Sequence, residues 1–347
     1  MPELDTFRAF RRLYERAAAD GRGEALFGAG AYEKSLAALK QYGLAGVGRA
    51  ILYFEFPFIG EPYMDLEVGY YQYDLSAPVR FEGEGAPFLQ KYFDACADEP
   101  LWKEYMFGYT CDFAAAAGGA VTPSLYIVPP AVTPIEDYVP KFLAVNGFGA
   151  RVNEAMHAFA NMPGKWIPHY AGAMVGRPDS PIRLGVMLTH EDRKRYSDKP
   201  EDLVRELEEY MCLSFPDRGR EALYVLADGG FIFDFQFDLY EGGVIGDGLG
   251  VSVNFGFEDV DPRKAAGFLE NGRGGDMMRG IEKMGLADAR WRKMDSACYA
   301  AQHIVRQQGG PPLWVGEKLC IDGIKVRFKK GTPFLSKGYL LGESWYI

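Results

Sequence analysis

The sequence predicts an α/β fold in which about ten antiparallel strands, paired as hairpins, are separated by helices. Some stretches alternate apolar and polar residues, as in Phe233-Asp234-Phe235-Gln236-Phe237, and this is the period of a strand with one buried face. Other stretches repeat apolar residues every three or four positions, the period of an amphipathic helix. The two kinds of stretch alternate roughly every 60 residues, as a repeat of pattern without a matching sequence repeat.

Residues 1–45 are predicted to form N-terminal helices that pack on a single helix–hairpin repeat domain of residues 46–347. Phe7, Phe10, Leu13 and Ala17 follow the helical spacing, and a second helix is expected over 32–42, before Gly43. The hairpins are expected at 52–69, 105–128, 167–188, 231–257 and 324–341. Further helices are expected at 87–96, 148–159, 203–211 and in the region that follows Asp261-Pro262.

The strands have one apolar and one polar face, and the intervening helices are expected to cover the apolar one. A sheet of about ten strands tends to curl or close, which removes its exposed edges. We therefore predict a closed barrel surrounded by helices, with the polar face lining its lumen. The alternative is an open sheet whose polar face is solvated, and the sequence leaves both open.

Composition excludes several classes of partner. The net charge of −10 argues against broad contact with nucleic acid or with an anionic membrane surface. Five cysteines without CxxC spacing argue against a disulfide framework or a structural zinc site, so most are expected to be buried thiols. No apolar signal segment and no run of about eighteen apolar residues occurs, so a cytoplasmic protein is predicted.

Other motifs are interpreted as turns and loops. His190-Glu191-Asp192 is expected to be a solvated turn, and Asn271–Gly275 a mobile loop. The glycines of Gly246–Gly250 lack dinucleotide-binding spacing and are interpreted as part of a turn between strands. The sequence contains neither a GxSxG nucleophile elbow nor a phosphate-binding GxxxxGK motif.

The last hairpin contains a segment that resembles a known family. Lys325-Val326-Arg327-Phe328-Lys329, a turn through Gly331 and then Lys337-Gly338-Tyr339-Leu340 is similar to the basic paired strands of the indole-modifying aromatic prenyltransferases, whose barrel is called the ABBA fold. The overall pattern of five helix–hairpin units resembles that barrel over nearly the whole chain. The segment lies at the C-terminus, which is not where that branch places it.

The resemblance implies transfer of an allylic isoprenoid from its diphosphate to an aromatic or peptide acceptor, in natural-product biosynthesis. The leaving diphosphate requires clustered cations and hydroxyls, the allyl cation requires aromatic walls, and the acceptor requires a carboxylate base. The candidates for the diphosphate are Arg183, Lys325, Arg327, Lys337 and Tyr339. The candidates for the aromatic walls are Tyr53 and Tyr71, and those for the acceptor-side carboxylates are Glu55 and Glu67.

A departure from the family pattern keeps other functions open. Asp234 and Asp238 would repel a diphosphate unless they held Mg²⁺, which two carboxylates at i and i+4 on one strand face could do. The same acids suit a cationic ligand or a basic peptide, which predicts a non-catalytic binding accessory of a peptide-modifying pathway as the alternative. The basic residues of 325–329 also fit a solvent-facing edge strand, and the acids a solvated face. An unrelated α+β enzyme with its site on loops is a third interpretation.

Overall fold

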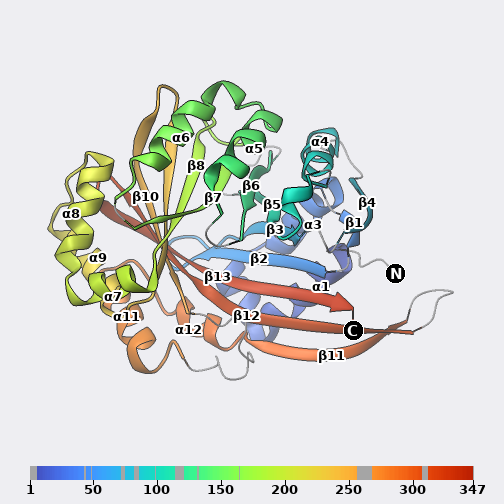
Figure 1. Ribbon diagram of the computed structural model, residues 1–347. Helices are drawn as coiled ribbons and strands as arrows, with labels where there is room; N and C mark the ends of the chain where they lie inside the picture. Colours follow the sequence, from blue (N-terminus) through green and yellow to red (C-terminus); the bar gives the residue numbers. More distant parts are fainter. Residues whose placement is uncertain are drawn as a thin grey trace.

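Ten strands close into an antiparallel barrel, and an eleventh extends the sheet beyond it (Figure 1). The computed structural model describes residues 6–346 apart from 43, 48, 72–74, 82–85, 98, 114–120, 131–132, 164, 256–267 and 307–311. The sheet order is β10-β9-β8-β7-β6-β5-β3-β2-β13-β12-β11, and an additional pairing of β10 with β12 closes the barrel. This closure confirms the predicted barrel and shows that the alternative of an open sheet is wrong.

The barrel consists of five hairpins joined in sequence order. Their strands are β2 (Arg49–Pro57) with β3 (Asp65–Tyr71), β5 (Met106–Cys111) with β6 (Ser124–Val128), β7 (Ile167–Ala173) with β8 (Ile182–Met187), β9 (Ile232–Tyr240) with β10 (Val244–Asn254), and β12 (Pro312–Lys329) with β13 (Thr332–Tyr346). β1 (Leu44–Val47) and β4 (Leu75–Phe81) form a separate two-stranded sheet, and β11 (Tyr299–Arg306) pairs with the first part of β12. Neither β11 nor the small sheet is predicted by the alternation pattern.

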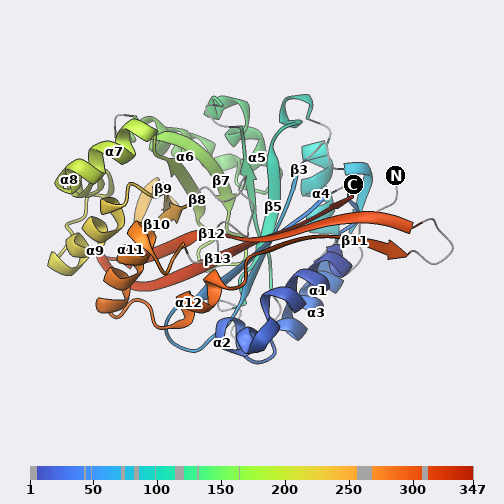
Figure 2. The same ribbon diagram turned by 90° about the horizontal axis from the view of Figure 1, so that it is seen from below.

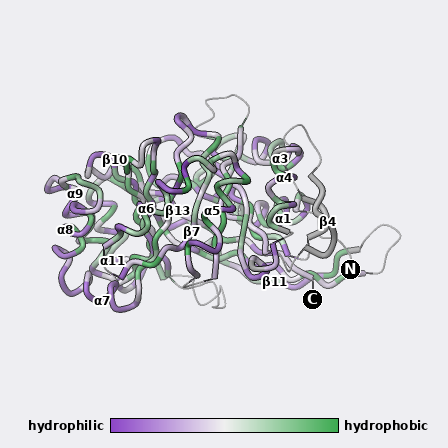
Figure 3. Tube along the Cα trace, turned by 45° about the horizontal axis from the view of Figure 1, so that its top comes forward, coloured by the Kyte–Doolittle hydropathy of each residue, from purple (hydrophilic) through white to green (hydrophobic). Residues whose placement is uncertain are grey.

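Helices surround the barrel (Figures 1 and 2). They are α1 (Thr6–Ala17), α2 (Arg22–Phe27), α3 (Ala31–Tyr42), α4 (Ala86–Ala97), α5 (Val139–Val145), α6 (Val152–Ala160), α7 (His190–Asp198), α8 (Pro200–Met211), α9 (Asp217–Asp228), α11 (Gly272–Lys283) and α12 (Arg290–Asp295). The first forty residues thus contain three helices and not two. In Figure 3 the peripheral α7 is largely hydrophilic, which fits a helix at the outside of the molecule.

The hydrophobic core lies between the outer face of the barrel and the helices. Leu52, Phe54 and Phe56 of β2 are fully buried in it, as are Phe235 and Phe237 of β9. The residues between them on each strand therefore point into the lumen, since successive side chains of a strand alternate between its faces. Apolar burial on the outside thus selects which polar residues line the inside.

Three local predictions are wrong. His190 begins α7, and the Thr189 hydroxyl caps this helix by accepting the Asp192 backbone N–H at 3.0 Å. Residues 246–250 lie within β10, and residues 272–275 begin α11. The glycines at the start of α11 allow close packing, because a Cβ on Gly274 would lie 2.6 Å from the Phe268 ring.

The remaining predictions about the fold concern the region after Asp261, the cysteines and membrane-spanning helices. The helical region expected from Asp261 lies outside the described residues. Cys96, Cys111 and Cys320 are buried free thiols, whereas Cys212 is exposed and Cys298 half-buried. None of the helices in the described part of the chain is long and apolar enough to cross a membrane.

Candidate functional site

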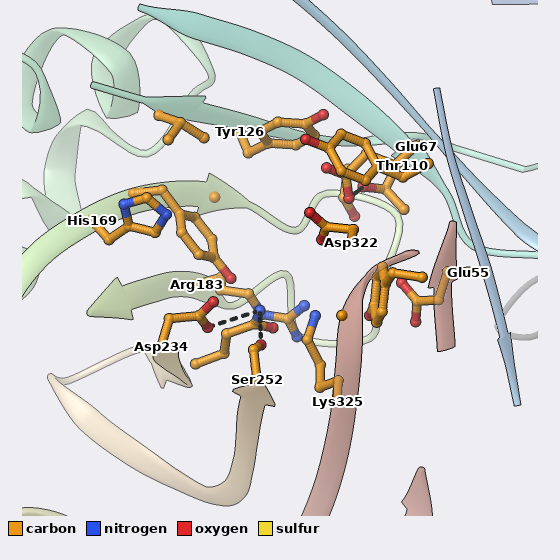
Figure 4. A pocket seen from close by; sticks show the side chains of 18 of the residues that line it. Glu55, Glu67, Thr110, Tyr126, His169, Arg183, Asp234, Ser252, Asp322 and Lys325 are labelled. Atoms are coloured by element: carbon orange, nitrogen blue, oxygen red, sulfur yellow. Dashed lines mark hydrogen bonds between the residues drawn. The ribbon is translucent and has the colours of Figure 1, made fainter. Parts of the chain in front are cut away.

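All ten barrel strands contribute side chains to one cavity of about 310 Å³ in the lumen (Figure 4). A volume of this size is typical of sites for small molecules. Of the residues predicted for a site, the cavity is lined by Tyr53, Glu55, Glu67, Tyr71, Arg183, Asp234, Lys325, Arg327 and Tyr339. The interpretations of the basic strand as a solvent-facing edge and of the acids as a solvated face are therefore wrong, although Lys329 is exposed.

Glycines on the inner face make room for the tyrosines of the cavity. Gly185 stands opposite Tyr170 in the β7–β8 register, and a Cβ on Gly185 would lie 2.1 Å from the Tyr170 ring. Gly108 stands opposite Tyr126, and its Cβ would lie 2.7 Å from the Tyr126 hydroxyl. Each ring lies against a strand position without a side chain, so the rings form walls and leave the lumen open.

One end of the cavity is cationic. Arg183 at the start of β8 donates to both carboxylate oxygens of Asp238, at 2.9 and 3.0 Å. Arg177, in the loop between β7 and β8, donates to Asp112 at 2.8 Å. Arg327, near the end of β12, forms no hydrogen bond or ion pair with another described residue, and the buried Nε of Arg177 also has no partner there. Cationic donors without an acceptor in the described part of the chain thus gather at this end.

Lys325 faces the middle of the cavity. Its ammonium lies 4.6 Å from the centre of the Tyr339 ring and forms no ion pair with a described residue. Burial lowers the pKa of Lys325 to about 8, although Glu55 and Asp234 oppose the shift. Figure 4 shows Lys325 and Arg183 converging on the same part of the cavity from β12 and β8. The Tyr339 hydroxyl is buried and has no hydrogen-bond partner among the described residues.

Lys337 lies outside the cavity lining, in a buried ion cluster with Glu55 and Asp65. Its ammonium lies 2.5 Å from Glu55 and 3.0 Å from Asp65, and Asp65 also accepts the Phe113 backbone N–H at 2.8 Å. Burial alone would raise the pKa of Glu55, but Lys337 and Lys325 bring it well below its usual range. Burial raises the pKa of Asp65 to about 6, against the effect of Lys337. Lys337 does not line the cavity, although it was predicted to bind the diphosphate.

Glu67 and Asp234 differ from Glu55 and Asp65 because they are not bound to a lysine or arginine of the described chain. β3 and β9 are five strands apart in both directions around the barrel, so the two residues face each other across the lumen. Glu67 accepts the Thr110 hydroxyl at 3.3 Å, Asp234 accepts the Gln236 amide at 3.4 Å, and neither forms an ion pair with a described residue. Burial raises the pKa of Glu67 to about 7, although Lys325 lowers it.

The predicted pair of magnesium ligands is divided by an ion pair. Asp238 is bound to Arg183 through both oxygens, whereas Asp234 faces the cavity. In the ranges that the structure describes, no group of three or more His, Cys, Asp or Glu side chains could hold a metal ion. Magnesium stays a prediction, and Asp234 and a bound anion would have to supply its ligands.

Several cavity residues were not predicted from the sequence, namely Thr110, Asp112, Tyr126, His169, Tyr170, Arg177, Phe233 and Asp322. The alternation of Ser124, Tyr126 and Val128 with apolar neighbours could have identified Tyr126. Tyr170 follows a register irregularity between Pro168 and Tyr170, which simple alternation does not show. Arg177 lies in a loop, so only the folded chain brings it to the barrel.

The chain was compared with known proteins. No protein-family model matches it, and no curated protein matches it in sequence.

Proposed function

We propose that the chain is a prenyltransferase-like enzyme that transfers an allylic group from its diphosphate to an aromatic or peptide acceptor. The observation that carries this proposal is the gathering of cationic donors at one end of an aromatic cavity, where the described residues offer them no acceptor. Arg327 and Arg177 have unused donors at that end, and Lys325 adds an ammonium without an ion pair to a described residue in the middle of the cavity. Buried donors normally have acceptors, so this arrangement supports an anionic ligand with several oxygens.

In this reaction the allylic C–O bond breaks, and its electron pair leaves with the diphosphate. The cations at the end of the cavity stabilise the negative charge of the leaving group. The allyl cation is stabilised by the faces of Tyr126, Tyr170 and Tyr339, which also limit the access of water. The acceptor atom then forms the new bond to the allyl carbon and releases a proton.

Glu67 is the better candidate for accepting that proton. Its pKa is raised to about 7 by burial, so its carboxylate is basic enough to take up a proton near neutral pH. Glu55 is held in its ionised form by Lys337, which makes it a weaker base. We therefore assign Glu67 as the base and Glu55 to orientation of the acceptor.

Calorimetry with a non-ionising donor analogue, dimethylallyl thiolodiphosphate, tests the proposal with and without Mg²⁺. We expect saturable binding that Arg327→Gln weakens roughly 10- to 100-fold, because one charged hydrogen-bonding group is lost. The matched control is Lys329→Gln, which removes an exposed cation from the same strand and should leave the affinity unchanged. A folded protein that gives no heat with the analogue under either condition would contradict the proposal.

A second candidate is a non-catalytic protein that binds a cationic ligand or a basic peptide. It is favoured by Glu67 and Asp234, which face the cavity without an ion pair to a described residue. Calorimetry with a lysine-rich peptide distinguishes the two candidates. The binding protein would be supported if the peptide gives a heat of binding that is lost in Asp234→Asn and the thiolodiphosphate gives none.

A further inference from the structure

Lys325 has the environment of a reactive amine. It is the only lysine among the described residues that line the cavity, and no described carboxylate lies within ion-pair distance of it. An ammonium that is desolvated beside other cations loses its proton more readily than one in water. Burial, with the charges of Arg183 and Arg327, lowers the pKa of Lys325 despite Glu55 and Asp234. A neutral amine is therefore accessible close to physiological pH.

We propose that Lys325 is a carbonyl-reactive lysine that forms an imine with an aldehyde or ketone ligand carrying an anionic group. The cavity provides space for such a ligand, and Arg327 has guanidinium donors without a described acceptor. The tyrosine faces would contact an apolar or aromatic body of the ligand. This activity is separate from allyl transfer and does not depend on it.

The chemistry requires no oxidant or reductant. The neutral Lys325 nitrogen attacks the carbonyl carbon, a C–N bond forms, and the π electrons of C=O move to the oxygen. A proton passes from nitrogen to that oxygen and gives a carbinolamine. Its hydroxyl takes up a second proton and leaves as water, while the nitrogen lone pair forms the C=N bond.

Charged and polar groups on several strands line the cavity around Lys325, and the carboxyl groups among them would take part in these proton transfers. The lining groups are Glu55, Glu67, Arg183, Asp234, Arg327 and Tyr339. Glu67 is suited to donate the proton that removes water, because burial raises its pKa to about 7 and it is partly protonated in neutral solution. The Tyr339 ring contacts the amine, so it also limits how the carbonyl can approach.

Reductive trapping tests the proposal with pyridoxal 5′-phosphate, an aldehyde that carries a phosphate. The full chain is treated with this probe and cyanoborohydride, and modified lysines are located by peptide mass spectrometry. We expect Lys325 to be modified on the order of tenfold or more faster than the exposed Lys329 and Lys330 of the same hairpin. Pyrophosphate should slow modification of Lys325 but not of the two exposed lysines. Pyridoxal, which lacks the phosphate, should show a weaker preference.

Equal or faster modification of Lys329 and Lys330, or an unmodified Lys325, would overturn the proposal. Lys325→Arg provides the matched variant, because it keeps the positive charge and removes the primary amine. It should lose the fast adduct while its circular dichroism spectrum stays that of the natural protein, so that the loss reports the missing primary amine. Failure of the thiolodiphosphate to bind would contradict allyl transfer without changing the rate at which pyridoxal 5′-phosphate modifies Lys325, so the two proposals fail separately.

Discussion

Two lysines on neighbouring strands, Lys325 of β12 and Lys337 of β13, stand directly opposite each other in the register yet have opposite environments. Lys337 lies between the carboxylates of Glu55 and Asp65, and these charges raise its pKa although burial alone would lower it. Lys325 contacts the Tyr339 ring, forms no ion pair with a described residue, and has a lowered pKa. The two lysines thus occupy paired positions in the sheet, and they differ in the side chains that surround their ammonium groups.

The difference indicates which buried charge serves stability and which serves binding. A buried cation with two bound carboxylates is satisfied by the protein, whereas a buried cation without a carboxylate partner is costly and persists where a ligand or a reaction uses it. We therefore assign Lys337 to the structure of the barrel and Lys325 to its function. Three predictions test this assignment, in order of expected effect.

Lys337→Met has the largest expected effect. It leaves the buried carboxylates of Glu55 and Asp65 close together without a cation, so we expect a loss of about 3–5 kcal/mol in the free energy of unfolding. Urea denaturation at pH 7 followed by circular dichroism measures this. Lys329→Met, an exposed site in the same hairpin, should change stability by less than about 0.5 kcal/mol. A loss below about 1 kcal/mol in Lys337→Met would show that the cluster is not structural.

Glu67→Gln tests the cavity carboxylate that forms no ion pair with a described residue. Because the folded protein raises the pKa of Glu67 from 4.5 to about 7, it binds this proton more tightly than the unfolded chain does. The stability of the natural protein should therefore fall as the pH rises from 4.5 to about 7, by up to about 3 kcal/mol from this residue. Asp65 contributes in the same direction up to about pH 6.

In Glu67→Gln that part of the fall should disappear, so the variant should be more stable than the natural protein at pH 8. Urea denaturation of both proteins at several values between pH 4.5 and 8 provides the measurement. Parallel curves for the two proteins would contradict the raised pKa of Glu67.

Lys325→Met has the smallest expected effect on stability and contrasts most directly with Lys337→Met. We expect the free energy of unfolding at pH 7 to change by less than about 1 kcal/mol or to increase. The reason is that the substitution removes a buried charge that has no ion pair with a described residue. The natural protein should gain stability from about pH 8 to 10.5, where the unfolded chain binds the Lys325 proton and the folded chain does not. The variant should lack this gain, and a loss of several kcal/mol at pH 7 would reveal an ion pair at Lys325.

The strand faces could be predicted from particular residues. Phe233, Phe235 and Phe237 alternate with Asp234 and Gln236, and the structure places Phe235 and Phe237 in the core and both polar residues at the cavity. The prediction is wrong for Phe233, which lines the cavity and not the core. The same reasoning brought Glu55, Glu67, Lys325 and Tyr339 to one face. It failed where local rules do not apply, as at the irregular register of Tyr170 and in the loop that carries Arg177.

By itself the sequence determined the five hairpins and which side of most strands is polar, because alternation is a local property that short stretches of chain carry. Only the tertiary structure decided that the sheet closes, since closure pairs β10 with β12 and depends on the accumulated twist of all ten strands. It also decided which lysine meets carboxylates. The partners of Lys337 come from β2 and β3 at the other end of the chain. A local sequence pattern does not predict contacts between residues so far apart in the sequence.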